Sequence, residues 1–397
     1  MSSRRSVPRP PPGGLLVLFP AGGGDGLARR LRHATGVRLS RSEHGGAGEK
    51  HGAIGQGVFF GRLDAALVYA DADQRRALGR FAGANGLLIE RERHLRPAVI
   101  RDAFHASLRL PLRDTRSGTW GLRASGVLDS SYSGRGVRLA ILDTGLDLEH
   151  PDFSHRAVRS RSFVTGLPVH DRNGHGTCCA GIAVGPARPR RAARYGVAPE
   201  AELYVAKVLD DDANGTDGNV LAGIDWAVRK GCAVISISLG TPAGEGGGYS
   251  RVFERIAARA LAAGSLLVAP AGNASQRPDS IAPVDHPANC PSVLGVGALN
   301  QSLALASFSN GGPDPRAGGM DLAAAGTAVL SAAPRPTLYQ VASGTSIAAP
   351  LVAGVAALIA EASPGARGAT LRALLLKNAR PLPARARSAR VRMVCAP

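Results

Sequence analysis

The feature that most limits how this chain can fold is a series of short, continuously apolar segments that alternate with helical segments from Trp120 onward. Such alternation is typical of a mostly parallel sheet with helices on both faces, because strands buried on both faces carry apolar side chains throughout. We predict this α/β fold, in three layers, with strands over residues 137–142, 203–208, 233–239, 265–269 and 293–297 and helices over residues 176–184, 219–230, 249–263 and 346–360.

The residues before Trp120 follow a different pattern. Residues 1–52 are rich in Gly, Pro and Arg without clear periodicity, and we expect a disordered basic segment. Residues 53–97 indicate a small α+β domain, with strand character over 58–69 and 86–90 and a helix over 71–82. The remaining parts are interpreted as a polar linker, a main domain and a basic C-terminal tail, at residues 98–118, 119–365 and 366–397 respectively.

The net positive charge of the chain comes from its two flanks. The formal net charge is +18, yet residues 119–365 are neutral, with 20 Lys/Arg and 20 Asp/Glu. A nucleic-acid-binding domain is expected to carry its basic residues on a folded surface. Basic flanks of this composition are more typical of solvated chain, so we expect no nucleic-acid partner.

The five cysteines form neither a disulfide framework nor a zinc-binding pattern, since their number is odd and Cys178 and Cys179 are adjacent. Cys232 and Cys290 lie in apolar contexts and are expected to be buried thiols. A single disulfide stays open as an alternative. No run of apolar residues approaches 18, so we also expect no membrane span.

A hydroxyl stands at the start of the last predicted helix, in the run Gly344-Thr345-Ser346-Ile347. A serine in this position commonly only caps the helix. The helix that follows is apolar and carries Pro350 in its first turn, where a missing N–H costs little. Because free N–H groups at a helix start can hold an oxyanion, Ser346 is a candidate nucleophile that needs a base and an orienting acid.

Three further segments supply these groups. Asp143 directly follows the strand at 137–142, at its carboxyl end, and is followed by a turn. His175 is flanked by Gly on both sides and opens a small-residue helix. Asn273 follows Gly272 just after the strand at 265–269, from where its amide N–H can point at a developing oxyanion. Each residue alone is consistent with a purely structural role.

Together these segments resemble the subtilisin-like serine proteases (subtilases), in which Asp, His and Ser occur in this order. The resemblance covers about residues 120–365. It rests on Asp143-Thr144-Gly145-Leu146, His175-Gly176-Thr177, Ala271-Gly272-Asn273 and Gly344-Thr345-Ser346, with further matches at His150-Pro151-Asp152, Gly196-Val197-Ala198-Pro199, Ser238-Leu239-Gly240 and Ala306-Ser307-Phe308-Ser309.

The resemblance implies a serine endopeptidase that requires no cofactor. Ser346 would attack the scissile carbonyl and His175 would take its proton, while Asp143 would orient His175. Asn273 would bind the oxyanion together with the backbone N–H of Ser346. The rival interpretation is a catalytically silent subtilase-like binding protein, which the presence of all four residues disfavours.

The resemblance also implies how substrates bind and how the chain matures. Extended substrates would pair with Ser238-Leu239-Gly240 and with Gly215-Thr216-Asp217, as in β-strand addition. Residues 53–97 occupy the place of the family's inhibitory propeptide, and processing would fall within 98–118, where Arg109, Arg113 and Arg116 offer basic sites. A permanent N-terminal domain is the alternative. Partners would be protein or peptide substrates and the chain's own N-terminal segment, acting as an intramolecular inhibitor in a monomer.

Three departures from the family pattern stand out. The loop at residues 186–194, where many relatives bind calcium strongly, holds four Arg, so we predict that this strong site is absent; weak calcium binding stays open. Cys178 lies three residues after His175 and is expected near the site, either as packing or as a redox-sensitive thiol. Asp285 aligns with the floor of the primary specificity pocket, where a carboxylate would favour Arg or Lys; a solvated loop acid is the alternative.

The compartment stays undecided. Family resemblance implies secretion, but the apolar run at residues 15–19 is short for a signal peptide and follows several prolines. Arg4-Arg5 is only a weak twin-arginine signal, so a cytoplasmic location is the alternative.

Overall fold

The central element of the structure, a computed structural model, is a nine-stranded sheet. The structure describes residues 13–42, 53–97, 112–243, 248–311, 318–383 and 391–397. All described pairs of neighbouring strands run parallel except the pair at the C-terminal edge, which confirms the predicted mostly parallel sheet. From one edge to the other the strands are β18 (Arg380–Pro381), β19 (Arg392–Met393), β15 (Leu322–Ala325), β14 (Leu294–Leu299), β13 (Leu266–Pro270), β11 (Val234–Ile237), β7 (Arg138–Asp143), β9 (Glu202–Lys207) and β8 (Val158–Ser162).

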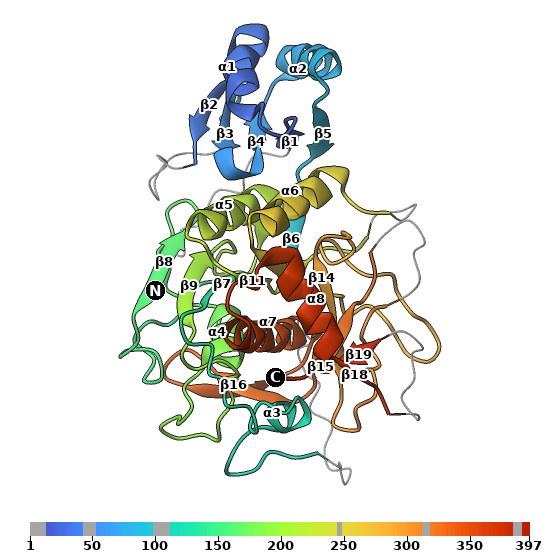
Figure 1. Ribbon diagram of the computed structural model, residues 1–397. Coiled ribbons are helices and arrows are strands. Elements are labelled where there is room, and N and C mark those ends of the chain that lie inside the picture. The colour runs from blue at the N-terminus through green and yellow to red at the C-terminus, as the bar shows by residue number, and fades with distance from the viewer. Residues whose placement is uncertain (1–12, 43–52, 98–111, 244–247, 312–317, 384–390) are drawn as a thin grey trace.

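Helices cover both faces of this sheet (Figure 1). The helices α4 (His175–Val184) and α7 (Thr345–Ala362) pack side by side in the core on one face. The helices α5 (Asp217–Arg229) and α6 (Arg251–Ala262) contribute to the core on the other face. Close approach of α4 and α7 requires small residues: a Cβ at Gly354 would lie 2.9 Å from the Ala183 carbonyl oxygen.

The apolar helix α7 is long and apolar enough to cross a membrane by length and composition alone. Its 18-residue span is, however, 83% buried inside the domain, against α4 and the sheet. This is the environment of the core helix of a globular domain, in which an apolar surface on all sides is expected.

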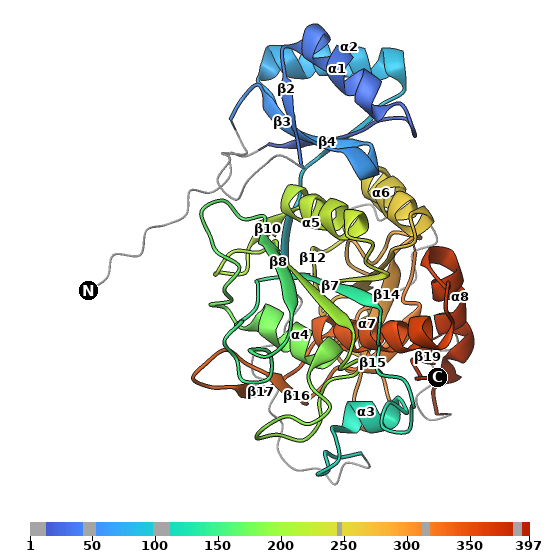
Figure 2. The ribbon, with the colours of Figure 1, turned by 60° about the vertical axis from the view of Figure 1, so that its left-hand side comes forward.

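A separate N-terminal domain lies over α5 and α6 (Figures 1 and 2). Two helices pack on one face of its five-stranded sheet and enclose a core of their own, which includes Phe19, Leu31 and Phe81. In chain order its elements are β1 (Leu15–Leu18), α1 (Gly24–Thr35), β2 (Arg38–Arg41), β3 (Gln56–Phe60), the 3₁₀ turn η1 (Gly61–Leu63), β4 (Ala65–Tyr69), α2 (Ala72–Asn85) and β5 (Leu88–Arg91).

The expectation that residues 1–52 are disordered is wrong for residues 15–41. Strand β1 lies between β4 and β5, antiparallel to both, so its partners come from distant parts of the chain. Helix α1 buries only a narrow side that includes Leu31, while its arginines face outward. A Gly- and Arg-rich composition hides such elements because their burial depends on tertiary partners rather than on local periodicity. The strand predicted at 58–69 is likewise a hairpin, broken by η1.

The interpretation of residues 366–397 as a basic tail is also wrong for its described parts. Helix α8 (Gly368–Asn378) buries Leu371 and Leu375 against α7 and the core, and strand β19 extends the central sheet beside β15. The basic residues lie on the outer sides of these elements; Arg372, for instance, pairs with Asp321 at 3.1 Å. Counting charge does not reveal a short strand whose alternate side chains are buried.

The linker predicted at residues 98–118, with its processing site, lies mainly outside the described residues. From Leu112 onward the chain already packs against the main domain. Asp114 accepts a hydrogen bond from the backbone N–H of Trp120 at 2.8 Å, where α3 (Trp120–Ala124) begins. The main domain therefore starts a few residues before 119.

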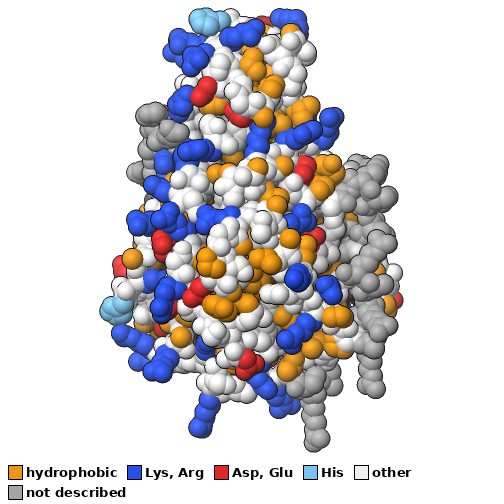
Figure 3. Space-filling view, viewed as in Figure 1, with side chains coloured by type: hydrophobic (Ala, Val, Ile, Leu, Met, Phe, Trp, Pro, Cys, Tyr) orange, Lys and Arg blue, Asp and Glu red, His pale blue; other side chains and the backbone are white. Residues whose placement is uncertain are grey.

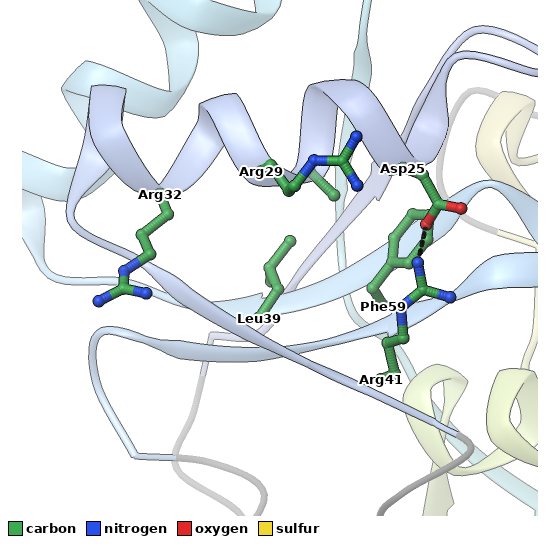
Figure 4. A pocket seen from close by; sticks show the side chains of 7 residues that line it. Asp25, Arg29, Arg32, Leu39, Arg41 and Phe59 are labelled. Carbon is green, nitrogen blue, oxygen red and sulfur yellow. Dashed lines mark hydrogen bonds and ion pairs between the residues drawn. The ribbon is translucent and has the colours of Figure 1, made fainter.

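Basic side chains are spread over both domains on the face shown in Figure 3. A shallow pocket in the N-terminal domain is lined by Arg29 and Arg32 of α1 and by Leu39 and Arg41 of β2 (Figure 4). Arg41 is held by an ion pair with Asp25 at 2.6 Å. None of the predicted site residues lines this pocket.

Candidate active site

Asp143 and His175 meet in the interior of the main domain. Asp143 is the last residue of β7, and His175 is the first residue of α4, following Gly174 at a φ of 102°. The His175 Nδ1 atom lies 2.8 Å from Asp143 Oδ1 and 2.9 Å from Oδ2, and both side chains are nearly inaccessible to solvent. The position at the carboxyl end of a strand agrees with the general rule for parallel sheets.

The pKa of His175 reflects two opposing effects. Burial by itself lowers the pKa of the imidazole, because it disfavours the charged form. The negative charge and the hydrogen bond of Asp143 more than offset this, so that the pKa of His175 is raised above its ordinary 6.5. The carboxylate also sets the tautomer, since with Nδ1–H donating to Asp143 the Nε2 atom can accept a proton.

A buried carboxylate that the sequence did not reveal, Asp171, holds the loop before His175. One of its oxygens accepts from the Thr177 N–H and hydroxyl at 2.8 and 2.7 Å, and the other from the Thr144 hydroxyl and the Gly174 N–H at 2.9 and 2.8 Å. Asp171 thereby links the turn after Asp143 to the first turn of α4. In the sequence, the only indication of this role is the position of Asp171, an acidic residue four positions before a histidine flanked by glycines.

Ser346 is the second residue of α7 and is fully buried. Its neighbour Thr345 ties the start of this helix to the loop after β13. The Thr345 N–H and hydroxyl both donate to Asn273 Oδ1, at 3.0 and 2.9 Å, and the hydroxyl accepts from the Gly272 N–H at 3.1 Å. Because the Asn273 oxygen is held in this way, its amide nitrogen is turned away from Thr345.

Cys179, rather than Cys178, contacts the histidine. The Cys179 sulfur lies 3.8 Å from both ring nitrogens of His175 and 3.6 Å from the Ser346 carbonyl oxygen. A residue four positions along a helix shares a face with the first, whereas the Cys178 carbonyl accepts from Ser331 on β16 (Val329–Ala332). The expected placement of Cys178 beside the base is therefore corrected to Cys179.

The five cysteines are all free and buried. Burial raises the pKa of Cys178 to about 12 and that of Cys179 well above its ordinary value. Among the described residues, Asp143, His175 and Cys179 form a group whose ligand atoms lie within 4.8 Å of one another, close enough to hold a metal ion. These atoms belong to the Asp–His pair itself, so an ion held there would block the histidine.

A strand from the N-terminal side lies between the two predicted substrate-binding segments. Strand β6 (His94–Pro97) pairs antiparallel with β10 (Gly215–Thr216) on one side and with β12 (Leu239–Gly240) on the other. In this register Leu95 is opposite Gly215 and Pro97 is opposite Leu239. The structure therefore brings the predicted segments together around an extended chain. Ser238, next to Leu239, is buried, and Asp217 follows β10 directly.

Asp285 lies beside the loop that carries Asn273. Its oxygen accepts from Asn310 Nδ2 at 3.1 Å, and a Cβ at Gly272 would come within 2.5 Å of its carboxyl carbon. Burial raises the pKa of Asp285 to about 7, with the Asn310 hydrogen bond opposing the rise. Asp285 is thus a half-buried carboxyl group rather than a fully solvated loop acid.

The carboxylate beside the loop at residues 186–194 is already engaged in hydrogen bonds. Asp152, the nearby carboxylate, already accepts from the hydroxyls of Tyr195 and Tyr339, at 2.7 and 3.0 Å, and from the Arg190 N–H at 3.4 Å. The Arg190 guanidinium lies 3.2 Å from His155 Nε2, which brings a positive charge to this place. Calcium needs several uncommitted oxygen ligands.

Comparisons with known proteins agree with this geometry. The profile of the subtilase family matches residues 134–392. The chain is 36% identical over 243 residues to subtilisin E of Bacillus subtilis (strain 168), which is 61% of this chain and 60% of that protein, and 37% identical to subtilisin DY of Bacillus licheniformis, covering 83% of it.

Among solved structures, the fold resembles that of a cold adapted subtilisin-like serine proteinase with a TM-score of 0.59 and 30% identity, over 71% of this chain and 99% of that one. The matched part spans about 60% of the length of subtilisin E. The profile match covers more than half of the residues and contains Asp143, His175 and Ser346. This chain belongs to the subtilase family.

Proposed function

We propose that the chain is a serine endopeptidase in which Asp143, His175 and Ser346 form the catalytic triad. The observation that carries this proposal is the pairing of His175 Nδ1 with both oxygens of Asp143, at the start of helix α4, which packs against the helix α7 that carries Ser346. The Ser346 hydroxyl attacks the scissile carbonyl while His175 Nε2 takes its proton, and the imidazolium later gives this proton to the leaving amine. Asp143 holds the imidazole and stabilises its charged form.

Asn273 stabilises the negative charge of the tetrahedral intermediate by donating a hydrogen bond to the oxyanion. The hydrogen bonds of Thr345 to Asn273 Oδ1 support this role, because they fix the side-chain oxygen and turn the amide nitrogen away from Thr345. The backbone N–H of Ser346, at the start of α7, acts beside this amide. Loss of one such donor typically lowers turnover roughly 10²–10³-fold.

Extended peptide chain binds between β10 and β12. The pairing of β6 with Gly215 and Thr216 on one side and with Leu239 and Gly240 on the other supports this mode, since it is β-strand addition by the chain's own segment. Asp285 then lies under the residue before the cut and favours Arg or Lys there. The substrates are proteins and peptides, and one chain carries all the residues needed.

The N-terminal domain acts as an intramolecular inhibitor of a zymogen that processes itself. The position of β6 between the substrate-binding segments supports this, because a substrate and β6 cannot pair with Leu239 at the same time. Since β6 ends at Pro97 beside the site, we expect processing at the beginning of 98–118 rather than at Arg109, Arg113 or Arg116. No cofactor is required, and the strong calcium site is absent.

Mass spectrometry of the purified wild type beside Ser346→Ala tests activity and processing together. We expect wild type to yield two fragments divided shortly after Pro97, and Ser346→Ala to stay intact. Ser363→Ala, at the far end of α7, is the matched control and should be processed normally. An intact wild type that also fails to react with a fluorophosphonate at Ser346 would favour the silent binding protein.

A further inference from the structure

We infer that Asp217 forms an acidic subsite that selects substrates carrying Arg or Lys four residues before the residue that pairs with Leu239. This inference rests on the proposed function, since it assumes that substrates bind where β6 lies. Arg93 precedes β6 and stands in this position relative to Pro97, the partner of Leu239.

Arg93 is held through both its side chain and its backbone, as a substrate residue bound in a subsite would be. Its guanidinium lies 3.2 Å from Asp217 Oδ2 and 2.9 Å from Glu90 Oε2. Its backbone N–H donates to Asp217 Oδ2 at 3.0 Å, and its carbonyl accepts from the Asp217 N–H at 3.0 Å. Asp217 therefore recognises both the backbone and the charge of this residue.

Of the two carboxylates around Arg93, Asp217 alone belongs to the main domain. Glu90 is part of the N-terminal domain and leaves with it, whereas Asp217 stays at the start of α5. Once Arg93 and β6 are gone, the Asp217 carboxylate loses the two hydrogen bonds that it accepts from Arg93, one from the guanidinium and one from the backbone N–H. A cationic side chain from a substrate restores the first of these, and any peptide backbone restores the second.

Two observations argue against a merely structural role for Asp217 as a helix cap. Helix α5 is capped by the Thr216 hydroxyl, which accepts from the Asn219 N–H at 3.4 Å. The Asp217 Oδ1 atom is buried without a hydrogen bond and faces His286 Nε2 at 3.4 Å. A fully buried carboxylate with an oxygen free of hydrogen bonds is typical of a binding site rather than of a cap.

His286, which lies behind Asp217, is held firmly in place. His286 is bridged to Thr241, just beyond β12, by two backbone hydrogen bonds of 2.9 and 3.0 Å, and its ring packs edge-on against Phe253 of α6 at 4.8 Å. The subsite is thus built from α5, α6 and the chain beside β12, which stay in place when β6 is replaced. Such preorganisation favours selection of a charged group.

The experiment uses a quenched fluorescent peptide with the chain's own residues 89–103, cleaved by the processed wild-type protein. In this peptide Arg93→Gln should lower kcat/KM about tenfold, since charge-assisted hydrogen bonds of partly exposed groups contribute on this order. Arg91→Gln, whose parent residue is exposed in the structure, is the control and should change kcat/KM less than about twofold.

The same peptides are then given to two variants. Asp217→Asn should cleave the parent and the Arg93→Gln peptide equally well, while Asp212→Asn, which removes an exposed charge from the same loop, should keep the tenfold difference. Equal cleavage of both peptides by wild type overturns the subsite, as does a difference that persists in Asp217→Asn. The wild-type comparison holds even where Asp217→Asn does not fold.

If wild type cleaves no peptide, the proposed function fails, and the subsite is then judged in the uncleaved full chain. Hydrogen exchange of the backbone N–H groups of residues 94–96 is measured in Arg93→Gln, Asp217→Asn and the double variant. Recognition of Arg93 by Asp217 predicts faster exchange in either single variant and no further increase in the double variant. Additive increases would overturn the contact on which the inference stands.

Discussion

Cys179 lies directly beneath the base of the proposed triad. Its sulfur touches both ring nitrogens of His175 and the carbonyl of Ser346, so any group added to it displaces the imidazole. Cys178, one residue earlier, points to β16 and β17 (Tyr339–Ala342) and has no such contact with the ring. Modification of the Cys179 thiol should therefore disturb His175, whereas modification of the Cys178 thiol should not.

We predict that an organomercurial inactivates wild type and Cys178→Ala but leaves Cys179→Ser active. The reaction should be slow near neutral pH and faster above it, because burial raises the pKa of the Cys179 thiol and keeps the thiolate scarce. Residual hydrolysis of a chromogenic peptide against time of exposure is the measurement. Equal loss of activity in Cys179→Ser would show that another group is responsible.

Asp285 should make the preference for basic residues depend on pH. Because burial raises its pKa to about 7, the carboxyl is neutral below this pH and charged above it. We expect kcat/KM for an Arg substrate, relative to a Phe substrate, to rise about tenfold between pH 6 and pH 8.5. Taking the ratio removes the titration of His175, which affects both substrates alike.

Asp285→Asn is the matched variant for this prediction. The Asn side chain can still accept from Asn310 but carries no charge, so the Arg-to-Phe ratio should stay low and flat across the same pH range. A wild-type ratio without pH dependence would mean that Asp285 does not face the substrate.

At the scale of elements, the N-terminal domain supplies caps for helices of the main domain. At the start of α6, Glu90 accepts from the Ser250 hydroxyl at 2.5 Å and from the N–H groups of Arg251 and Val252 at 2.9 and 3.2 Å. At the start of α5, Glu92 accepts from the Gly218 N–H at 3.1 Å. Carboxylates at helix N-termini are stabilised by the helix dipole and by the free N–H groups.

We predict that Glu90→Ala accelerates release of the N-terminal domain after processing about tenfold or more. The variant leaves the Ser250 hydroxyl and the N–H groups at the start of α6 without their acceptor, which weakens the interface by about 1–3 kcal/mol. The lag before peptide hydrolysis begins in a freshly processed sample measures the release. Asp73→Asn, on the exposed side of α2, is the control, and an equal lag in both variants would contradict the prediction.

The elements of the main domain could be predicted because each carries its own signal. Strand β7 is a continuous apolar run ended by Asp143, and α7 is a long apolar helix with Gly344 and Thr345 before Ser346. Strand β1 and helix α8 could not be predicted in this way, since the first is short and Gly-flanked and the second is masked by surrounding arginines. Their apolar faces are defined only by the strands and helices that cover them.

At the scale of the whole molecule, the N-terminal domain is joined to the main domain by polar contacts as well as by β6. The Arg259 guanidinium donates to the Leu63 and Phe19 carbonyls at 2.6 and 2.7 Å, and Asp225 accepts from the Ser42 hydroxyl at 2.6 Å. These contacts place the face of the small sheet on α5 and α6 (Figure 2). The proposed zymogen is therefore expected to be more stable than its processed form.

We predict that a chelator changes the melting temperature of the processed protein by less than about 2 °C. The reason is that Asp152 Oδ2 already accepts from the hydroxyls of Tyr195 and Tyr339, Oδ1 accepts from the Arg190 N–H, and arginines crowd the adjacent loop. Differential scanning calorimetry with and without excess EDTA is the measurement, and a related enzyme with an occupied calcium site is the positive control. A fall of ten degrees or more would show a structural calcium ion.

The sequence by itself determined the class of fold and the identity of the candidate reactive groups. Strands and helices of the main domain follow from apolar patterning, and Asp143, His175, Asn273 and Ser346 stand at strand ends and helix starts, where local sequence already defines the turn. These properties depend on neighbours along the chain, which a single sequence displays.

Tertiary structure alone decided which groups meet across long sequence separations. It brought Asp217 to Arg93, placed the Cys179 sulfur against the Ser346 carbonyl, and placed β6 between β10 and β12. It also enclosed Asp285, which raises the pKa of that carboxyl to about 7. The physical reason is that burial, charge pairing and strand registry depend on distances in space, and residues more than a hundred positions apart carry no local record of them.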